Sequence, residues 1–282
     1  MHANTLLQYL LPHRFLSRIV RHATRWTFAP WKNFLIRQIV QRYQVDMGEA
    51  AQPDPLAYRH FNAFFTRALK PGARPMATGT NTIACPADGR ISQAGNIESG
   101  RIFQAKGQSF TCAELLADET AARPYAHGSF ATIYLSPRDY HRVHMPLDGE
   151  LLQTVHIPGR IFSVAPFAVR EVPRLFARNE RLTCHFEGPH GPFVMVMVGA
   201  MLVSGVETVW SGEEIPPYGR QVTSKNYSGQ SIQLARGEEM ARFNMGSTVV
   251  LLLPRADAPD SALTAEQAVR MGMRLGHVPG NA

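Results

Sequence analysis

The sequence predicts an α+β fold in which amphipathic helices at the N-terminus precede an antiparallel, β-rich domain. Across residues 1–75, apolar and basic side chains recur at helical spacing. Across residues 76–255, short β-branched and apolar runs alternate with glycine and proline turns, which is typical of antiparallel strands. We expect the remaining segment, residues 256–282, to be a peripheral tail with a helical stretch near residues 264–275.

The first predicted helix follows Pro12, because proline is favoured in the first turn of a helix. At about 100° per residue, one face carries Arg14, Arg18, Arg21 and Arg25, and the other half carries Leu16, Ile19, Val20, Ala23 and Trp26. Such a helix suits the plane of an anionic phospholipid membrane. The alternative is a helix that packs its apolar face on the core and leaves its arginines in water. The sequence alone supports the two equally.

Two further helices and a set of strands follow. A second helix is predicted over residues 33–43 and a third over residues 57–69, before a proline- and glycine-rich linker at residues 70–75. The third helix places Phe61, Phe64, Phe65 and Leu69 on one face. The clearest strand patterns lie at residues 130–135, 182–186, 193–203, 208–209 and 249–253.

The net charge of +7 is concentrated at the N-terminus. Seven of the 29 Lys and Arg side chains lie in residues 1–45, which contain no acid, so the rest of the chain carries equal numbers of each sign. This placement favours a local anionic partner. Nucleic acid is not expected, because the basic segment matches no nucleic-acid-binding motif and the rest of the chain has no excess charge.

The cysteines and the hydropathy pattern indicate the cellular compartment of the protein. Cys85, Cys112 and Cys184 cannot all pair, and the N-terminus does not resemble a secretory signal, so we expect a reducing, cytoplasmic setting. The longest apolar run, residues 193–203, is too short to cross a bilayer. With the amphipathic helix, these features predict a peripheral protein on the cytoplasmic side of the cell membrane.

A Gly-Ser-Thr sequence at residues 246–248 leads directly into an apolar strand. Glycine permits strained backbone angles, so the Ser247 hydroxyl could attack the carbonyl of Gly246 if a base activates it. An N→O acyl shift and β-elimination would then split the chain and leave dehydroalanine, which hydrolyses to a pyruvoyl group and ammonia. A simple turn between strands explains the tripeptide equally well, so other motifs must decide.

Several other motifs occur in a fixed order along the chain. They are CPADGRI at 85–91, YLSPRDYHRVHMP at 134–146, HIPGRIFSV at 156–164, LFARNER at 175–181 and GVETVW at 205–210. Together with the Gly-Ser-Thr sequence, they closely resemble bacterial phosphatidylserine decarboxylase proenzymes over residues 55–255, and more loosely through the N-terminal helices. Met245 departs from the leucine that many members carry, which is a volume-conserving change.

The resemblance implies a self-cleavage triad. Asp88 would orient His144, His144 would accept the proton of Ser247, and Ser247 would attack Gly246. Cleavage between residues 246 and 247 would give a β chain, 1–246, and an α chain, 247–282. Outside this pattern, an aspartate before glycine is usually a turn residue, and a lone histidine is usually structural.

His141 lies three residues before His144, so a turn could bring the two side chains together, whereas a strand would separate them. We assign it as a candidate acid–base residue of the mature reaction, where it would protonate the carbanion carbon. A metal site at His141 and His144 is not expected, because no cysteine or carboxylate lies at a usual zinc spacing beside them.

Decarboxylation of an amino acid needs an electron sink, which pyridoxal phosphate provides through a lysine. The chain has four lysines and no phosphate-binding glycine loop, so a pyruvoyl group generated from Ser247 is the expected cofactor. The resemblance therefore implies conversion of phosphatidylserine to phosphatidylethanolamine and carbon dioxide, and it is compatible with a homodimer.

Three alternatives remain. The first is a serine lipid hydrolase, but the chain contains no Gly-x-Ser-x-Gly nucleophile elbow. A non-catalytic membrane-binding protein would show lipid binding without chain cleavage. A soluble pyruvoyl-dependent amino-acid decarboxylase would be indifferent to membranes.

Overall fold

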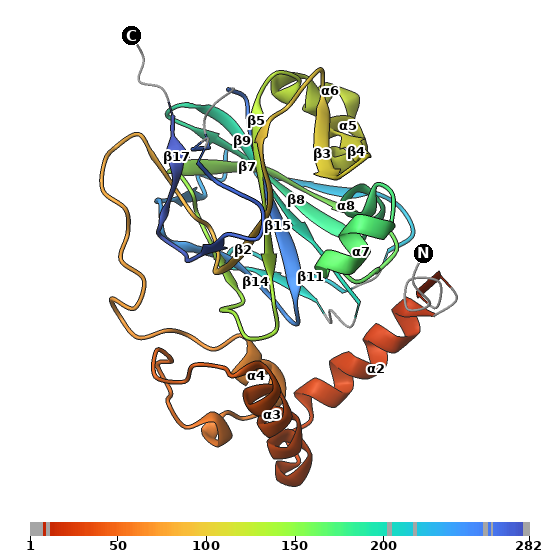
Figure 1. Ribbon diagram of the computed structural model, residues 1–282, viewed down its shortest axis with the longest axis vertical. Coiled ribbons are helices and arrows are strands. Elements are labelled where there is room, and N and C mark those ends of the chain that lie inside the picture. The colour runs from red at the N-terminus through yellow and green to blue at the C-terminus, as the bar shows by residue number, and fades with distance from the viewer. Residues whose placement is uncertain are drawn as a thin grey trace.

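A computed structural model describes residues 8–9, 12–201, 205–216, 219–255, 259–260 and 262–278. It confirms the α+β prediction, because helices at the N-terminus lie beside a β-rich body (Figure 1). The helices are α2 (His13–Arg25), α3 (Ala29–Tyr43), α4 (Phe61–Phe65), α5 (Cys112–Leu116), α6 (Glu119–Ala122), α7 (Pro166–Glu171) and α8 (Leu175–Arg178), with 3₁₀ turns at Pro55–Ala57 and Arg123–Tyr125.

The body is built around an antiparallel sheet with the order β12-β7-β8-β9-β15-β5-β2-β16, in which β13 also pairs with β7. Its strands are β2 (Gly89–Asn96), β5 (Ser129–Leu135), β7 (Gly149–Ile157), β8 (Arg181–Gly188), β9 (Gly191–Val198), β12 (Thr223–Asn226), β13 (Gln233–Leu234), β15 (Ser247–Leu253) and β16 (Ala268–Val269). Every residue of β15 is buried, which its run of β-branched and aliphatic side chains allows.

Three smaller sheets complete the body. One has the order β11-β10-β14-β6, and the other two are the pairs β1–β17 and β3–β4. Their strands are β1 (Thr82–Ala84), β3 (Arg101–Ala105), β4 (Gln108–Thr111), β6 (Arg142–His144), β10 (Val206–Thr208), β11 (Gly212–Ile215), β14 (Glu239–Phe243) and β17 (Arg274–His277).

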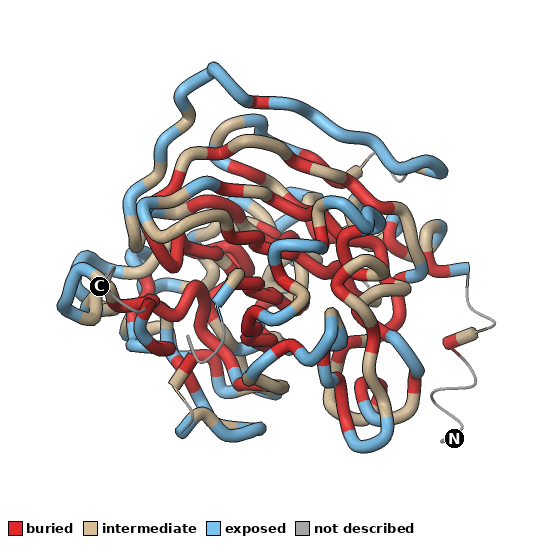
Figure 2. The backbone as a smooth tube through the Cα atoms, turned by 90° about the horizontal axis from the view of Figure 1, so that it is seen from above, coloured by how far each residue is buried: buried red, intermediate tan, exposed pale blue. Residues whose placement is uncertain are grey.

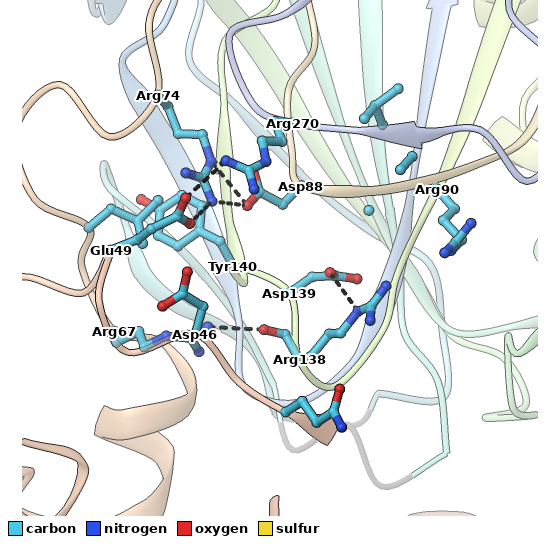
Figure 3. A pocket seen from close by; sticks show the side chains of 15 residues that line it. Asp46, Glu49, Arg67, Arg74, Asp88, Arg90, Arg138, Asp139, Tyr140 and Arg270 are labelled. Atoms are coloured by element: carbon cyan, nitrogen blue, oxygen red, sulfur yellow. Dashed lines mark hydrogen bonds and ion pairs between the residues drawn. The ribbon is translucent and has the colours of Figure 1, made fainter. Parts of the chain in front are cut away.

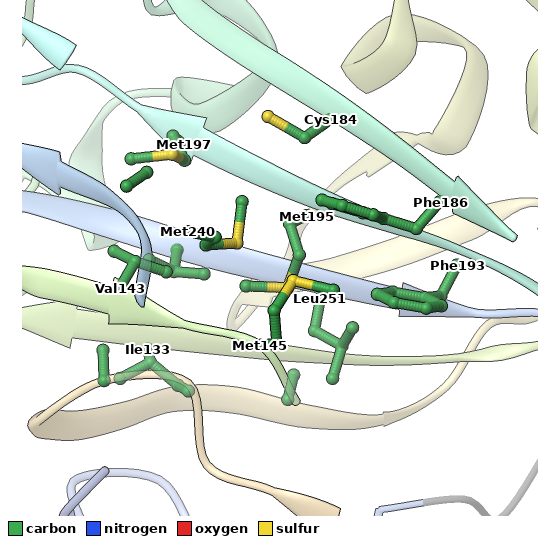
Figure 4. Close-up of a cluster of buried hydrophobic side chains, with 14 of the residues drawn as sticks. Ile133, Val143, Met145, Cys184, Phe186, Phe193, Met195, Met197, Met240 and Leu251 are labelled. Carbon is green, nitrogen blue, oxygen red and sulfur yellow. The ribbon is translucent and has the colours of Figure 1, made fainter. Parts of the chain in front are cut away.

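The core lies on both faces of the main sheet. Figure 2 shows buried segments gathered in the interior of the body and exposed segments mainly around its outside. Alternation along β15 sends Val249 and Leu251 into one cluster and Val250 and Leu252 into the other. Figure 4 shows the first cluster, where the rings of Phe186 and Phe193 stack at 5.2 Å beside several methionines. The second cluster contains buried side chains of α5, α7 and α8. Ser247 thus begins a strand that is anchored on both faces.

The described part of the C-terminal segment, residues 259–260 and 262–278, is neither helical nor peripheral, which corrects both expectations for these residues. β16 pairs with β2 and β17 pairs with β1, and Val269, Leu275 and Val278 belong to the core. Gly272 makes the turn between the two strands with a φ of +83°. The spacing of apolar residues predicted a helix because it reflects only neighbouring residues. The strand partners of this segment lie almost 200 residues earlier, so local spacing contains no information about them.

The second predicted helix is confirmed and is longer than expected, as α3. The third is much shorter, because only α4 and the preceding 3₁₀ turn are helical between residues 55 and 69. Phe61, Phe64 and Phe65 are buried together as their spacing predicts, whereas Leu69 forms an isolated β-bridge with Ala50.

Helix α2 has the predicted two faces, and three of its four arginines contact the body, whereas Arg18 is exposed. Arg21 and Arg25 form ion pairs with Glu213 of β11 at 2.6 and 3.1 Å. Arg14 lies 4.0 Å from the buried carboxylate of Glu180. The interpretation in which all four arginines meet an anionic surface is therefore contradicted for Arg21 and Arg25.

The apolar face of α2 is only partly covered by the body, since Leu16, Val20 and Ala23 are half-buried. Phe15, Ile19 and Trp26 are 60%, 50% and 55% exposed, and Phe28 and Phe34 beside or within α3 are 52% and 53% exposed. The alternative in which the whole apolar face packs on the core is therefore contradicted for Phe15, Ile19 and Trp26. Among the described residues, no helix has the length and hydropathy needed to cross a membrane.

Candidate active site

Ser247 is the first residue of β15, where it pairs with Leu135 of β5. Its side chain is 0% exposed, and its Oγ has no hydrogen-bond partner in the described part of the chain. Most buried hydroxyl groups are hydrogen-bonded, so an unpartnered one indicates a functional constraint or a position awaiting another group.

The strain in this segment lies at Met245, whose φ is +114°. Residues other than glycine rarely adopt such angles, and their cost is about 1–3 kcal/mol. Gly246 itself is outside the positive-φ region. A β-carbon added there would lie 3.6 Å from the carbonyl oxygen of Leu135 and 3.8 Å from Nε2 of His141, both ordinary contacts. The expectation that Gly246 takes the strained angles is therefore wrong.

His141 is the titratable side chain that faces this bond. Its Nδ1 lies 2.8 Å from the carbonyl oxygen of Asp139, and since a carbonyl only accepts, Nδ1 carries the proton. Nε2 consequently carries a lone pair, on the side of Gly246, and it has no hydrogen-bond partner among the residues that the structure describes. Burial lowers the pKa of His141 to about 3, and the charge of Arg67 acts in the same direction. Phe65 covers the ring at a centroid distance of 4.0 Å.

His144 occupies the other end of β6. Its Nδ1 donates to the carbonyl oxygen of Gly237 at 2.8 Å, and its Nε2 accepts from the hydroxyl of Tyr140 at 3.0 Å. Burial lowers its pKa. Both ring nitrogens are thus engaged, and neither contacts Ser247.

Asp88 lies in a polar cavity of about 300 Å³ shown in Figure 3. Arg74 binds its carboxylate through Nε at 2.9 and 3.1 Å, and the backbone N–H of Met271 donates to it at 2.9 Å. The same guanidinium donates to Glu49 at 2.7 Å. Burial acts to lower the pKa of Arg74, but the two carboxylates outweigh it and raise that pKa.

The structure therefore brings together Gly246, Ser247 and His141, and it does not assemble a continuous Asp88–His144–Ser247 relay. His144 is close to the Asp88 segment, since its backbone N–H donates to the carbonyl of Pro86 at 2.8 Å. However, the carbonyl of Gly237 takes the place that an aspartate has in a triad. The roles implied by the resemblance for Asp88 and His144 stay predictions.

An apolar cavity of about 380 Å³ borders Gly246. Its lining includes Ile39 and Tyr43 of α3, Phe65 of α4, Tyr134 of β5, Val164 and Met245. Cavities of this size and character hold small ligands or parts of larger ones. The cavity joins the N-terminal helices to the Gly246–Ser247 bond.

Two residues of this region were not predicted. Asp139 accepts hydrogen bonds from the backbone N–H and hydroxyl of Ser136 at 2.7 and 2.6 Å, which shapes the turn leading to His141. The Ser-Pro-Arg-Asp sequence was a readable signal for that turn. Asn244 is buried beside Met245, and no local pattern marks it.

Comparisons with known proteins place the chain. A family model described as phosphatidylserine decarboxylase matches residues 61–277, and a second, described as PSD, matches residues 3–44. The phosphatidylserine decarboxylase proenzyme of Xanthomonas axonopodis pv. citri (strain 306) is 60% identical over 272 residues, which cover 96% of this chain and 97% of that protein. The proenzyme of Xylella fastidiosa (strain M23) is 59% identical over 276 residues, covering 97% and 94%. With its motifs, its strand-borne serine and these matches along nearly its whole length, the chain belongs to the phosphatidylserine decarboxylase family.

Proposed function

We propose that this phosphatidylserine decarboxylase makes its own electrophile by cutting the chain between Gly246 and Ser247. The observation that carries the proposal is the buried Oγ of Ser247, which has no hydrogen-bond partner among the described residues. It follows the strained Met245 by two residues, and it comes directly after Gly246, whose β-carbon position lies 3.8 Å from Nε2 of His141. These groups fit a residue that is to become a pyruvoyl group. When formed, that group supplies the electron sink for loss of carbon dioxide.

The cut needs no outside reagent except water. Ser247 Oγ attacks the carbonyl carbon of Gly246, the amide C–N bond breaks, and an ester and a free amine form. Loss of the Cα proton of residue 247 then breaks the Cβ–O bond, which leaves Gly246 as a carboxylate and residue 247 as dehydroalanine. Water converts the dehydroalanine to pyruvoyl with release of ammonia.

Asp88 and His144 are proposed to drive the proton transfer from Ser247. In the structure, the hydroxyl of Tyr140 occupies Nε2 of His144, so this relay requires that hydrogen bond to open. A neutral imidazole whose Nδ1 is already held by a carbonyl has the correct tautomer for a base.

His141 is proposed to act after the cut. In the uncut chain its low pKa makes it a weak base and leaves it without an acidic proton on Nε2. Cleavage creates a carboxylate at Gly246, next to that nitrogen. An opposite charge at a few ångströms raises a histidine pKa by about 1–3 units, so the cut itself would move the pKa of His141 back toward its ordinary value and favour a proton on Nε2.

The α and β chains are expected to stay together after cleavage. β15 of the α chain lies between β9 and β5 of the β chain, and β16 and β17 pair with β2 and β1. Separation would break all of these ladders and open both core clusters.

We propose peripheral attachment to an anionic phospholipid membrane on the cytoplasmic side, through the exposed apolar face of α2 and its neighbours Phe28 and Phe34. The three cysteines are free and buried, which suits a reducing compartment. The cavity at Gly246 is lined in part by α3, so a lipid headgroup entering from the membrane-facing helices would reach Gly246, next to Ser247.

Intact-mass measurement of the purified protein tests the central proposal. The expected species are the fragments 1–246 and 247–282, and the smaller one should resist Edman sequencing because its N-terminus is a carbonyl. Ser247→Ala is the control and should stay one chain without decarboxylase activity. An uncut wild-type chain that hydrolyses lipid esters would support the hydrolase alternative. Lipid binding by an uncut chain without release of carbon dioxide would support the non-catalytic one.

A further inference from the structure

Asn244, two residues before the bond to be cut, is held by three hydrogen bonds from different parts of the fold. Its backbone N–H donates to the carbonyl of Gly205 at 2.8 Å. Its side-chain oxygen accepts from Nδ2 of Asn62 in α4 at 2.9 Å, and its Nδ2 donates to Oε1 of Glu207 in β10 at 2.8 Å. The residue is 0% exposed.

Neighbouring atoms on both sides restrict the position of the Asn244 side-chain amide. A β-carbon on Gly205 would lie 2.3 Å from the carbonyl oxygen of Ile215 and 3.1 Å from Nδ2 of Asn244, so backbone and amide are in close contact on that side. On the other side Asn62 is 5% exposed and belongs to the helix that carries Phe65, the ring that covers His141.

Met245 lies between this anchor and the first residue of β15. A φ of +114° persists for a methionine only where the surrounding structure over-determines it. Asn244 is fixed on one side of Met245, and Ser247 is fixed on the other by its register with Leu135. The strained Met245 therefore lies in a two-residue span, Met245–Gly246, between two fixed ends.

We propose that Asn244 is a positioning residue for self-cleavage, which holds the Gly246 carbonyl against the Ser247 hydroxyl through its hydrogen bonds to Asn62 and Glu207. This inference rests on the proposed cut between Gly246 and Ser247. Asn244 touches neither reacting atom, so it acts through the backbone of Met245.

The two side-chain hydrogen bonds of residue 244 require an amide, because one atom must accept from Asn62 and the other must donate to Glu207. An aspartate would place an oxygen against the carboxylate of Glu207. Exchange of Glu207 for glutamine would provide a donor for that oxygen and restore the contact. Glu207→Gln alone keeps an acceptor for Asn244, since the glutamine oxygen can replace the carboxylate oxygen.

The experiment compares the cleavage rates of wild type, Asn244→Asp, Glu207→Gln and the double variant, with full-length protein made by cell-free synthesis and followed on gels. Asn244→Asp should cut about tenfold or more slowly, because a buried hydrogen bond is replaced by repulsion. Glu207→Gln should cut at nearly the wild-type rate. The double variant should recover to within about threefold of wild type.

Two further measurements separate positioning from general damage. Decarboxylase activity per mole of pyruvoyl should be the same in all four proteins, since Asn244 acts before maturation. Asn62→Ala removes the donor on the other side and should also slow the cut, which keeps the test available if Asn244→Asp does not fold.

Wild-type cleavage rates in both Asn244→Asp and Asn62→Ala would overturn the inference. A double variant no faster than Asn244→Asp, or a parallel fall in activity per mole of pyruvoyl, would also overturn it, because either result indicates general damage. A wild-type protein that never cuts would instead refute the proposed function.

Discussion

His141 faces Gly246, the residue on the N-terminal side of the bond that is proposed to break. Nε2 of His141 lies 3.8 Å from the place a β-carbon on Gly246 would take, while its Nδ1 is held by the carbonyl of Asp139 at 2.8 Å. Before cleavage the histidine faces a neutral peptide, and after cleavage it would face a carboxylate. The charge that faces His141 would thus differ before and after cleavage, and the role proposed for His141 therefore differs from that proposed for His144.

Substitution of His144 and of His141, in separate variants, should distinguish self-cleavage from decarboxylation. Asp88→Asn and His144→Ala should slow or stop cleavage, because each disables the proposed proton transfer from Ser247. His141→Ala should cut but decarboxylate poorly, by about 10²–10⁴-fold per mole of pyruvoyl, as is usual when an acid–base residue is lost. Gel analysis and carbon dioxide release on the same samples measure both. Normal cutting and normal turnover in His141→Ala would remove it from the site.

Acid should destabilise the uncut protein partly through His141. The unfolded residue binds a proton near its ordinary pKa of 6.5, but the folded one does not until about pH 3. Stability from this group is therefore present above pH 6.5 and declines as pH falls between these values, by at most about 1.4 kcal/mol per pH unit. Urea midpoints of Ser247→Ala should fall over this range, and addition of His141→Gln should make the fall shallower. Equal slopes would contradict the buried, neutral histidine.

The strain at Met245 can be measured by a matched pair of substitutions. Met245→Ala and Met245→Gly both lose the side chain, but only glycine tolerates a φ of +114° at little cost. In the uncut Ser247→Ala background, the glycine variant should be more stable than the alanine variant by about 1 kcal/mol or more. Chemical denaturation measures the difference. A more stable alanine variant would show that the backbone is relaxed at this position.

Membrane attachment should depend on apolar side chains more than on the paired arginines. Changing Phe15, Ile19 and Trp26 together to serine should weaken binding to anionic vesicles by about 100-fold or more, since burial of each side chain contributes about 1.5–3 kcal/mol. Self-cleavage should continue, because none of the three contacts the site. Co-sedimentation measures binding.

The control for this experiment is Val222→Ser with Met273→Ser, which removes two other exposed apolar side chains, 54% and 45% exposed, elsewhere on the body. Its binding should match that of wild type. Equal loss in the control and the triple variant would mean that attachment is not localised to α2.

The sequence by itself determined what depends on local order. Periodicity placed α2 and α3, strand patterning placed β15, and the order of five motifs around Ser247 identified the family before any contact was known. These features are readable because helix and strand periods are properties of neighbouring residues.

Tertiary structure alone decided which way each feature faces and what it touches. Periodicity defined two faces of α2, but only the fold shows that Arg21 and Arg25 pair with Glu213, which lies 192 residues after Arg21. The strands after residue 262 depend on partners at β1 and β2, and the anchoring of the Asn244 side chain depends on Asn62 and Glu207. Hydrogen bonds and ion pairs between distant residues leave no periodic trace in the chain, so they became visible only once the chain was folded.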